Sequence, residues 1–220
     1  MTERRRSMKV TIIYDNETSR EDLRADWGFS CLVEAHGKRM LFDAGAKGEI
    51  LLGNMKKLNI EPSSIDAVVI SHADWDHTGG LSDFAKENSE ATLYIPPSYR
   101  MPPDSAGEVV VVEEPMEISE GIFSTGELRG IEQSLVVITE RGPVVITGCS
   151  HPGVGDILEA ASAHGKPYAL IGGLHGFNEF ERLDGIPMVC ATHCTEFKKD
   201  IASRYPDAYI EGGAGRIIDL

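Results

Sequence analysis

One short stretch, residues 70–80, constrains this chain more than any other, because it places two histidines and two aspartates directly after an apolar run. That run, residues 67–70, has the composition of a buried strand. Gly79 and Gly80 end the stretch, and residues 81–86 follow with a pattern that permits a helix. Imidazole and carboxylate groups are good ligands for divalent transition metals. The stretch is therefore predicted to be a metal-binding loop whose two ends can serve two ions.

Three further histidines, His151, His175 and His193, also follow predicted strands directly. Of the seven histidines in the chain, only His36 and His164 lie elsewhere. The histidines at strand ends are flanked by Gly, Ser or Thr, and loops on a rigid scaffold are where functional side chains are usually mounted. Together the five indicate one metal site that is assembled from several strand ends.

Strands and helices alternate along the chain, which is typical of the α/β class. Strands are predicted at 9–14, 28–35, 38–42, 67–70, 91–95, 109–112, 121–124, 134–139, 143–147, 168–171, 187–191 and 208–211. Helices are predicted at 49–58, 154–164 and 196–204. The polar segment 98–106 is predicted to be a surface loop that borders a cleft.

Composition narrows the class of protein. A length of 220 residues suits one large domain, and we expect residues 1–220 to form it, with residues 1–8 mobile. A net charge of −14 argues against nucleic acid as a partner. The four cysteines show no disulfide spacing, no apolar run could span a bilayer, and the start lacks the apolar core of a signal peptide. We expect a cytoplasmic protein with a small-molecule substrate and no membrane partner, and its oligomeric state is left open.

Several motifs make the chain resemble the metallo-β-lactamase superfamily, and within it the branch of 7,8-dihydropterin-6-yl-methyl-4-(β-D-ribofuranosyl)aminobenzene 5'-phosphate synthase-like proteins. The loop at 72–77 is similar to the superfamily's His-x-His-x-Asp-His signature, with Asp74 in the place of the second histidine. The most specific similarities to the branch are the segments 147–153, 171–175 and 193–195. The resemblance implies a four-layer αββα sandwich of the α/β (α+β) class.

The resemblance also implies a ligand set for two divalent metal ions. One ion would be held by His72, Asp74 and His151, and the other by Asp76, His77 and His193. We expect zinc, with manganese or iron as alternatives, because Asp74 adds a hard and negatively charged oxygen ligand.

Four residues have roles implied around these ligands. Asp76 is expected to be catalytic as well as metal-binding, because it can orient a water molecule. Asp43 is expected to support the metal loop from behind, and His175 to lie on the substrate side. Cys149 is either a ligand or a neighbour of the metals.

The expected function is that of a metal-dependent hydrolase or transferase, acting on a small metabolite that could be phosphorylated, through a metal-activated water. Two alternatives stay open on the same fold. The first is a di-iron redox protein, because the oxygen-reducing flavodiiron proteins of the superfamily carry an acidic residue at the place of Asp74. The second is a non-catalytic module that binds a metal or a metabolite.

Overall fold

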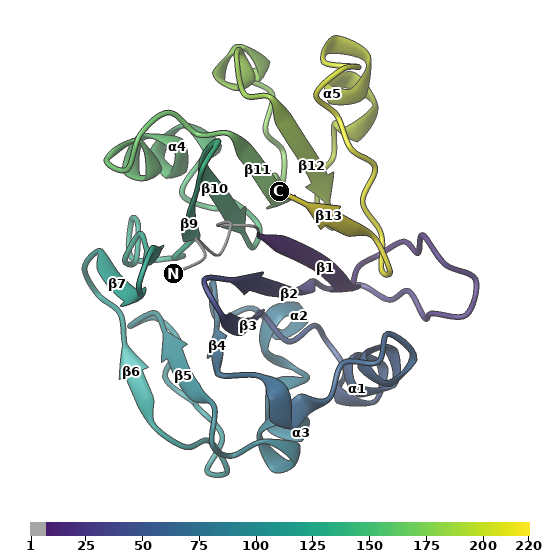
Figure 1. Cartoon of the computed structure of the whole chain (residues 1–220), viewed down its shortest axis with the longest axis vertical. Coiled ribbons are helices and arrows are strands. Elements are labelled where there is room, and N and C mark those ends of the chain that lie inside the picture. The colour runs from purple at the N-terminus through teal and green to yellow at the C-terminus, as the bar shows by residue number, and fades with distance from the viewer. Residues whose placement is uncertain (1–7) are drawn as a thin grey trace, which may run out of the picture.

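The structure is a computed structural model that describes residues 8–220, in which two β-sheets pack face to face (Figure 1). The first sheet has the strand order β13 (Ile217–Asp219), β1 (Lys9–Tyr14), β2 (Ser30–Ala35), β3 (Lys38–Phe42), β4 (Ala67–Val69), β5 (Thr92–Ile95) and β6 (Val109–Val111). The second has the order β12 (Met188–Thr192), β11 (Ala169–Gly173), β10 (Gly142–Thr147), β9 (Leu135–Thr139), β8 (Ile122–Ser124) and β7 (Met116–Ser119).

Strand direction decides where the loops meet. β2 is antiparallel to both β1 and β3, so β1 and β3 run in the same direction, and β4 is parallel to β3. In the second sheet β10, β11 and β12 are mutually parallel. The carboxyl ends of β1, β3 and β4 therefore share one edge of the first sheet, and those of β10 to β12 share one edge of the second.

The core between the sheets follows from the alternation of side chains along each strand. Val144 and Ile146 of β10 point into the sandwich and join a cluster that includes Val10 and Ile12 of β1. Val145, between them, belongs instead to the cluster on the outer face, where the helices of the second half pack. Every central strand thus buries both faces, which is why these strands are nearly continuous apolar runs.

Helices cover both outer faces. α1 (Gly48–Lys57) and α3 (Leu81–Glu87) pack on the first sheet, and α4 (Val154–Ser162) and α5 (Lys198–Arg204) pack on the second (Figure 1). The remaining helical pieces are short: α2 (Trp75–Thr78), η1 (Pro62–Ser64) and η2 (Phe180–Leu183). The predicted α/β class and αββα sandwich are confirmed. Among residues 8–220, no helix is long and apolar enough to cross a membrane.

Most predicted elements form near their predicted positions, with the following differences. Residues 208–211, predicted as a strand, make only one bridge, from Tyr209 to Val189, before the glycines at 212 and 213 turn the chain away. The edge strands β7 and β13 were not predicted, because neither has an apolar run longer than two residues. The metal loop is not wholly irregular, since its second half forms the helical turn α2.

The start of the described chain is held in the first sheet. Met8 is 2% exposed, and its N–H and C=O both form hydrogen bonds with the backbone of Leu220. Met8 is thus paired in the sheet, and the mobility expected for residues 1–8 stays a prediction. Residues 1–7 lie outside the described residues.

The close packing of the core leads us to predict a small loss of stability for one conservative substitution. Replacing Ile146 with valine is expected to lower the free energy of unfolding by about 1 kcal/mol, because one methylene is removed from a fully buried site. Urea denaturation measures this. Ile217→Val is the control, because Ile217 is 52% exposed and should lose less than about 0.5 kcal/mol. Equal losses at the two positions would contradict the packing described for β10.

Candidate metal centre

The candidate site lies where strand ends of the two sheets meet. The predicted site residues that follow each strand are Asp43 after β3, His72 to His77 after β4, Cys149 and His151 after β10, His175 after β11 and His193 after β12. Residues far apart in the chain are thereby brought together, as the contacts between 72, 77, 151 and 193 show.

The backbone turns sharply at four of these strand ends. Asp43, Ser150, His175 and His193 have φ angles of 58°, 63°, 47° and 46°, in the left-handed region that residues other than glycine seldom adopt. Such conformations cost energy and gather at functional sites, where the surrounding structure holds them. Their concentration here marks these loop ends as functional.

The more buried cluster comprises Asp76, His77 and His193. Asp76 Oδ2 lies 3.3 Å from Nε2 of His193 and 3.9 Å from Nε2 of His77, and the two Nε2 atoms are 3.2 Å apart. Burial by itself raises the pKa of Asp76, but a hydrogen bond from His193 and the charge of His77, each present when the imidazole is protonated, outweigh it and hold the pKa well below its usual range. The carboxylate is therefore ionised and faces two imidazoles.

The second cluster comprises His72, Asp74 and His151 and lies nearer to solvent. Asp74 Oδ2 is 3.4 Å from Nε2 of His72 and 4.0 Å from Nε2 of His151. His72 is buried, whereas the Asp74 side chain is 59% exposed. The rings of His72 and His77 lie 4.1 Å apart between centroids, so the two clusters adjoin. The structure brings both predicted ligand sets together, and metal binding by each residue stays a prediction.

Asp43 sits behind two of the histidines and determines their orientation. Its Oδ2 lies 2.7 Å from Nδ1 of His77 and accepts the hydroxyl hydrogen of Ser71 at 2.7 Å. Since the Ser71 hydroxyl donates to Asp43, Nδ1 of His72, 2.8 Å from the same hydroxyl oxygen, must donate to it. Both imidazoles therefore carry their proton on Nδ1 and present an Nε2 lone pair to the site. Asp43 thus contacts the loop that it is predicted to support.

Asn16 orients the ring of His193, as Asp43 orients the ring of His77. No role was predicted for Asn16 from the sequence. Its side-chain N–H donates to the carbonyl of His193 at 3.1 Å, so its Oδ1 is the acceptor for Nδ1 of His193 at 2.9 Å. Asp15 accepts the backbone N–H of His193 at 3.1 Å. Both residues follow β1, whose carboxyl end shares the edge of the site.

Removing the Asn16 acceptor is expected to weaken metal binding about 10- to 100-fold, because the tautomer and ring angle of His193 are no longer held. The change is Asn16→Ala, and zinc affinity is measured by competition with a chelator. Asn16→Asp keeps an acceptor oxygen and should restore most of the affinity. Equal affinity in the native protein and the alanine variant would show that Asn16 does not position His193.

The arrangement of these imidazoles fits a cation. Lone pairs of His77 and His193 face each other at 3.2 Å, which is favourable only with a proton or a metal ion between them. Nε2 of His72 is buried without a hydrogen-bond partner among residues 8–220. Imidazole nitrogens, one buried carboxylate and a nearby thiol are the donors that zinc and neighbouring transition metals prefer. The residues present therefore fit the divalent metals that the sequence predicts.

Glu132 is the most important residue of the site that was not predicted from the sequence. It is fully buried, and its Oε1 accepts the three consecutive backbone N–H groups of residues 148–150, each at 3.0 Å, while Oε2 accepts that of His151 at 2.9 Å. Burial raises its pKa, but the hydrogen bond from His151, the charge of His72 and the backbone donors lower it to about 2. Glu132 therefore shapes the loop that carries Cys149 and His151.

Two thiols and a fifth histidine complete the site. Cys149 is buried with Sγ 3.3 Å from Nε2 of His77, and Cys194 Sγ lies 3.1 Å from Cys149 Sγ. The hydrogen bond between the two thiols raises the pKa of Cys149 and lowers the pKa of Cys194. His175 is exposed, with its ring 5.1 Å from that of His151.

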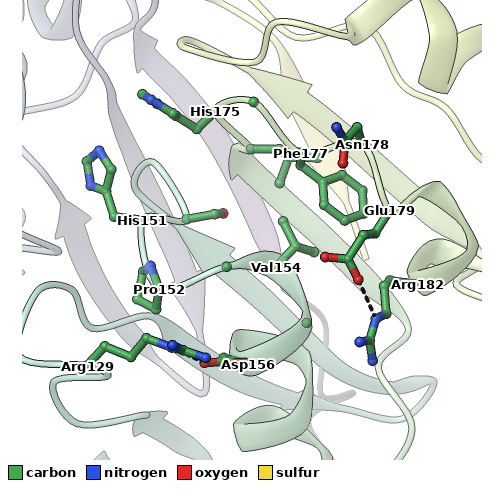
Figure 2. A pocket seen from close by; sticks show the side chains of 15 residues that line it. Arg129, His151, Pro152, Val154, Asp156, His175, Phe177, Asn178, Glu179 and Arg182 are labelled. Carbon is green, nitrogen blue, oxygen red and sulfur yellow. Dashed lines mark hydrogen bonds and ion pairs between the residues drawn. The ribbon is translucent and has the colours of Figure 1, made fainter.

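Two cavities open beside the cluster. One of about 430 Å³ has His151 and His175 on one side and the ion pair of Glu179 with Arg182 on the other (Figure 2). Another of about 440 Å³ is lined by His72, Asp74 and His151 together with Ser98, Gly130 and Ile131. Ser98 belongs to the segment that was predicted to border a cleft. Both cavities are large enough for a small metabolite.

Comparison with known proteins decides the family. Residues 28–166 match the sequence profile of the metallo-beta-lactamase superfamily. The chain belongs to this superfamily. The family predicted from the motifs is confirmed.

Relatives within the superfamily cover nearly the whole chain. A protein of Methanocaldococcus jannaschii named 7,8-dihydropterin-6-methyl-4-(beta-D-ribofuranosyl)-aminobenzene-5'-phosphate synthase is 29% identical, over 87% of this chain and 89% of its own. The solved structure of Tm1679, described as a metal-dependent hydrolase of the beta-lactamase superfamily, is 25% identical, with a TM-score of 0.80 and coverage of 97% of this chain and 99% of its own. The metallo-beta-lactamase fold protein YhfI from Bacillus subtilis has a TM-score of 0.67 at 15% identity, covering 98% of this chain and all of its own.

Proposed function

We propose that this protein is a metal-dependent hydrolase or transferase that acts on a small metabolite, with phosphoesters and lactones as the substrate classes to test first. The observation that carries the proposal is that His72, His77 and His193 hold their proton on Nδ1 and present an Nε2 lone pair to the site, two of them beside the carboxylate of Asp76. A site with this donor set is suited to holding cations in a defined geometry next to open cavities.

Bound divalent ions would lower the pKa of a coordinated water to near neutrality and polarise an ester or phosphate oxygen of the substrate. His72, Asp74 and His151 would hold one ion, and Asp76, His77 and His193 the other. The Asp76 carboxylate, buried among histidines, can accept a hydrogen bond from the attacking water and orient it. His175 lines the pocket of Figure 2 on the side of His151 and can donate a proton to a leaving group there.

The relatives support metal-dependent chemistry for this protein but do not distinguish hydrolysis from group transfer. One relative bears the name of a synthase, and one solved neighbour is described as a metal-dependent hydrolase. Fold does not determine function, so the activity must be argued from the site. Group transfer to water and group transfer to another acceptor use the same metal-held geometry, which is why the proposal covers both.

The deciding experiment is metal analysis of protein purified without added metal, for the native chain and for Asp74→His, followed by assays on phosphoesters and lactones. About two equivalents of zinc or manganese per chain, with metal-dependent turnover, are expected. Metal bound without turnover of either class would count against the proposed substrates. No metal in the native chain but full loading of Asp74→His would favour the non-catalytic module.

Asp74 keeps the redox alternative open. Its carboxylate lies within 4.0 Å of both His72 and His151, and a carboxylate suits harder ions such as iron or manganese better than a third imidazole does. Iron in the purified protein that reacts with oxygen would move the di-iron redox protein ahead of the hydrolase.

A further inference from the structure

Two thiols lie within the histidine cluster and have no part in the chemistry proposed above. Cys149 follows β10 and Cys194 follows β12, and their Sγ atoms approach to 3.1 Å across the end of β11. Gly173 of β11 makes this approach possible, because a Cβ there would lie 2.8 Å from Cys194 Sγ. Both cysteines are free, and their separation is well beyond the ~2.05 Å of a disulfide bond.

Cys149 occupies the centre of the cluster. Its Sγ lies within 4.8 Å of donor atoms of His72 and His77, of His193 and Cys194, and of His151 and His175. It is thus within reach of histidines from both predicted ligand sets. Its side chain is buried and lies among polar donors, outside the apolar core between the sheets.

The spacing between donors matches that around a metal ion. Nitrogen and sulfur ligands at about 2.0 and 2.3 Å from one tetrahedral ion lie roughly 3.3 to 3.8 Å apart. Nε2 of His77 is 3.3 Å from Cys149 Sγ and 3.2 Å from Nε2 of His193. Cys149 is therefore placed at ligand distance among imidazoles, and a thiol that coordinates a metal ion binds it as the thiolate.

We propose that Cys149 binds as a thiolate between the two metal positions, and that Cys194 positions it by donating its S–H to the Cys149 sulfur. The inference rests on the proposed function only in that the site holds metal. Binding breaks the S–H bond of Cys149, forms a metal–sulfur bond and releases one proton to solvent. A thiolate ligand favours zinc, iron and cobalt over magnesium, calcium and manganese, so the cofactor class is a borderline or soft divalent ion.

Cobalt(II) is the probe for the test, because a cobalt–thiolate bond has a strong near-ultraviolet charge-transfer absorption. The native protein loaded with cobalt should show this band, and Cys149→Ser should lose it while still binding cobalt through the histidines. On zinc binding, the native protein should release one more proton than Cys149→Ser. Cys190→Ala is the matched control, because Cys190 is buried in the core between the sheets and should leave the band unchanged.

The role of Cys194 is tested by the same band. Cys194→Ala removes the donor and should shift the energy of the charge-transfer band, whereas Cys194→Ser keeps a donor and should restore it. Loss of the whole band in Cys194→Ser, or no change in Cys194→Ala, would overturn the positioning role.

X-ray absorption of the zinc-loaded native protein keeps the inference testable even if the Cys149 variant does not fold. A sulfur neighbour at about 2.3 Å from zinc is expected. Bound zinc with only nitrogen and oxygen neighbours would overturn the thiolate ligand and leave the proposed function standing. Failure to bind zinc or cobalt at all would overturn both, and a Cys149–Cys194 disulfide in the freshly purified protein would overturn the thiolate alone.

Discussion

Replacing His77 with alanine is expected to lower metal affinity by more than about 100-fold and to abolish turnover, because the loss of a ligand must exceed the roughly 10- to 100-fold loss caused by removing a supporting partner. Nε2 of His77 lies 3.2 Å from that of His193, 3.3 Å from Cys149 Sγ and 3.9 Å from Asp76 Oδ2. His77 is thus within 3.9 Å of three potential metal ligands. Its loss also leaves Asp43 Oδ2 with Ser71 as its remaining side-chain partner.

Elemental analysis, competition with a chelator and turnover of the substrate found for the native protein measure the effect. His164→Ala is the matched control, because His164 is exposed and its ring packs on that of Phe123, 4.2 Å away between centroids. It should keep native metal content and activity. If His77→Ala still bound two ions and turned over substrate, both the candidate metal centre and the proposed function would be wrong.

Glu132→Gln is expected to lower the free energy of unfolding by about 3 kcal/mol and to weaken metal binding about 10- to 100-fold. The side chain keeps its size, so packing is unchanged. One of its two acceptor oxygens becomes an NH₂ group, which cannot accept from the backbone N–H groups of residues 148–150 or from that of His151. At least one buried donor is left unpaired, and the negative charge that these donors share is lost.

Stability and metal binding must be separated in this experiment, because a bound ion stabilises the folded state by mass action. Urea denaturation is therefore carried out with excess chelator, and metal affinity is measured independently. Glu140→Gln serves as control, because Glu140 is exposed and should change stability by less than about 0.5 kcal/mol. A loss below about 1 kcal/mol for Glu132→Gln would show that the 148–151 loop does not depend on this carboxylate.

The positions of the histidines could be predicted because they depend on local sequence. An apolar run followed by a polar residue and glycine predicts a strand end, and β4, β10, β11 and β12 each form within two residues of their predicted bounds. The histidines that follow them converge, as expected of loops at shared sheet edges. Motif similarity then indicated the family, which the profile match confirmed.

Two supporting residues, Asn16 and Glu132, were missed because their contacts are not local. Asn16 holds His193, 177 residues away, and Glu132 binds the backbone of a loop 16 to 19 residues later. A glutamate before a strand usually lies in solvent, and nothing in its neighbours indicates that this one is fully buried. The strand predicted at 208–211 was wrong for a related reason. Its β-propensity could not show that the following glycines would end its pairing with β12 after one bridge.

By itself, the sequence determined the alternation of strands and helices, the class of fold and the placement of histidines and aspartates at strand ends, because hydrophobic periodicity and turn residues act over a few positions. Only the tertiary structure decided which nitrogen of each histidine faces the site, which carboxylate is buried and where the thiols meet. Those properties arise from strand pairing and sheet packing, which bring Asp43, Glu132 and Asn16 against the ligands from distant parts of the chain.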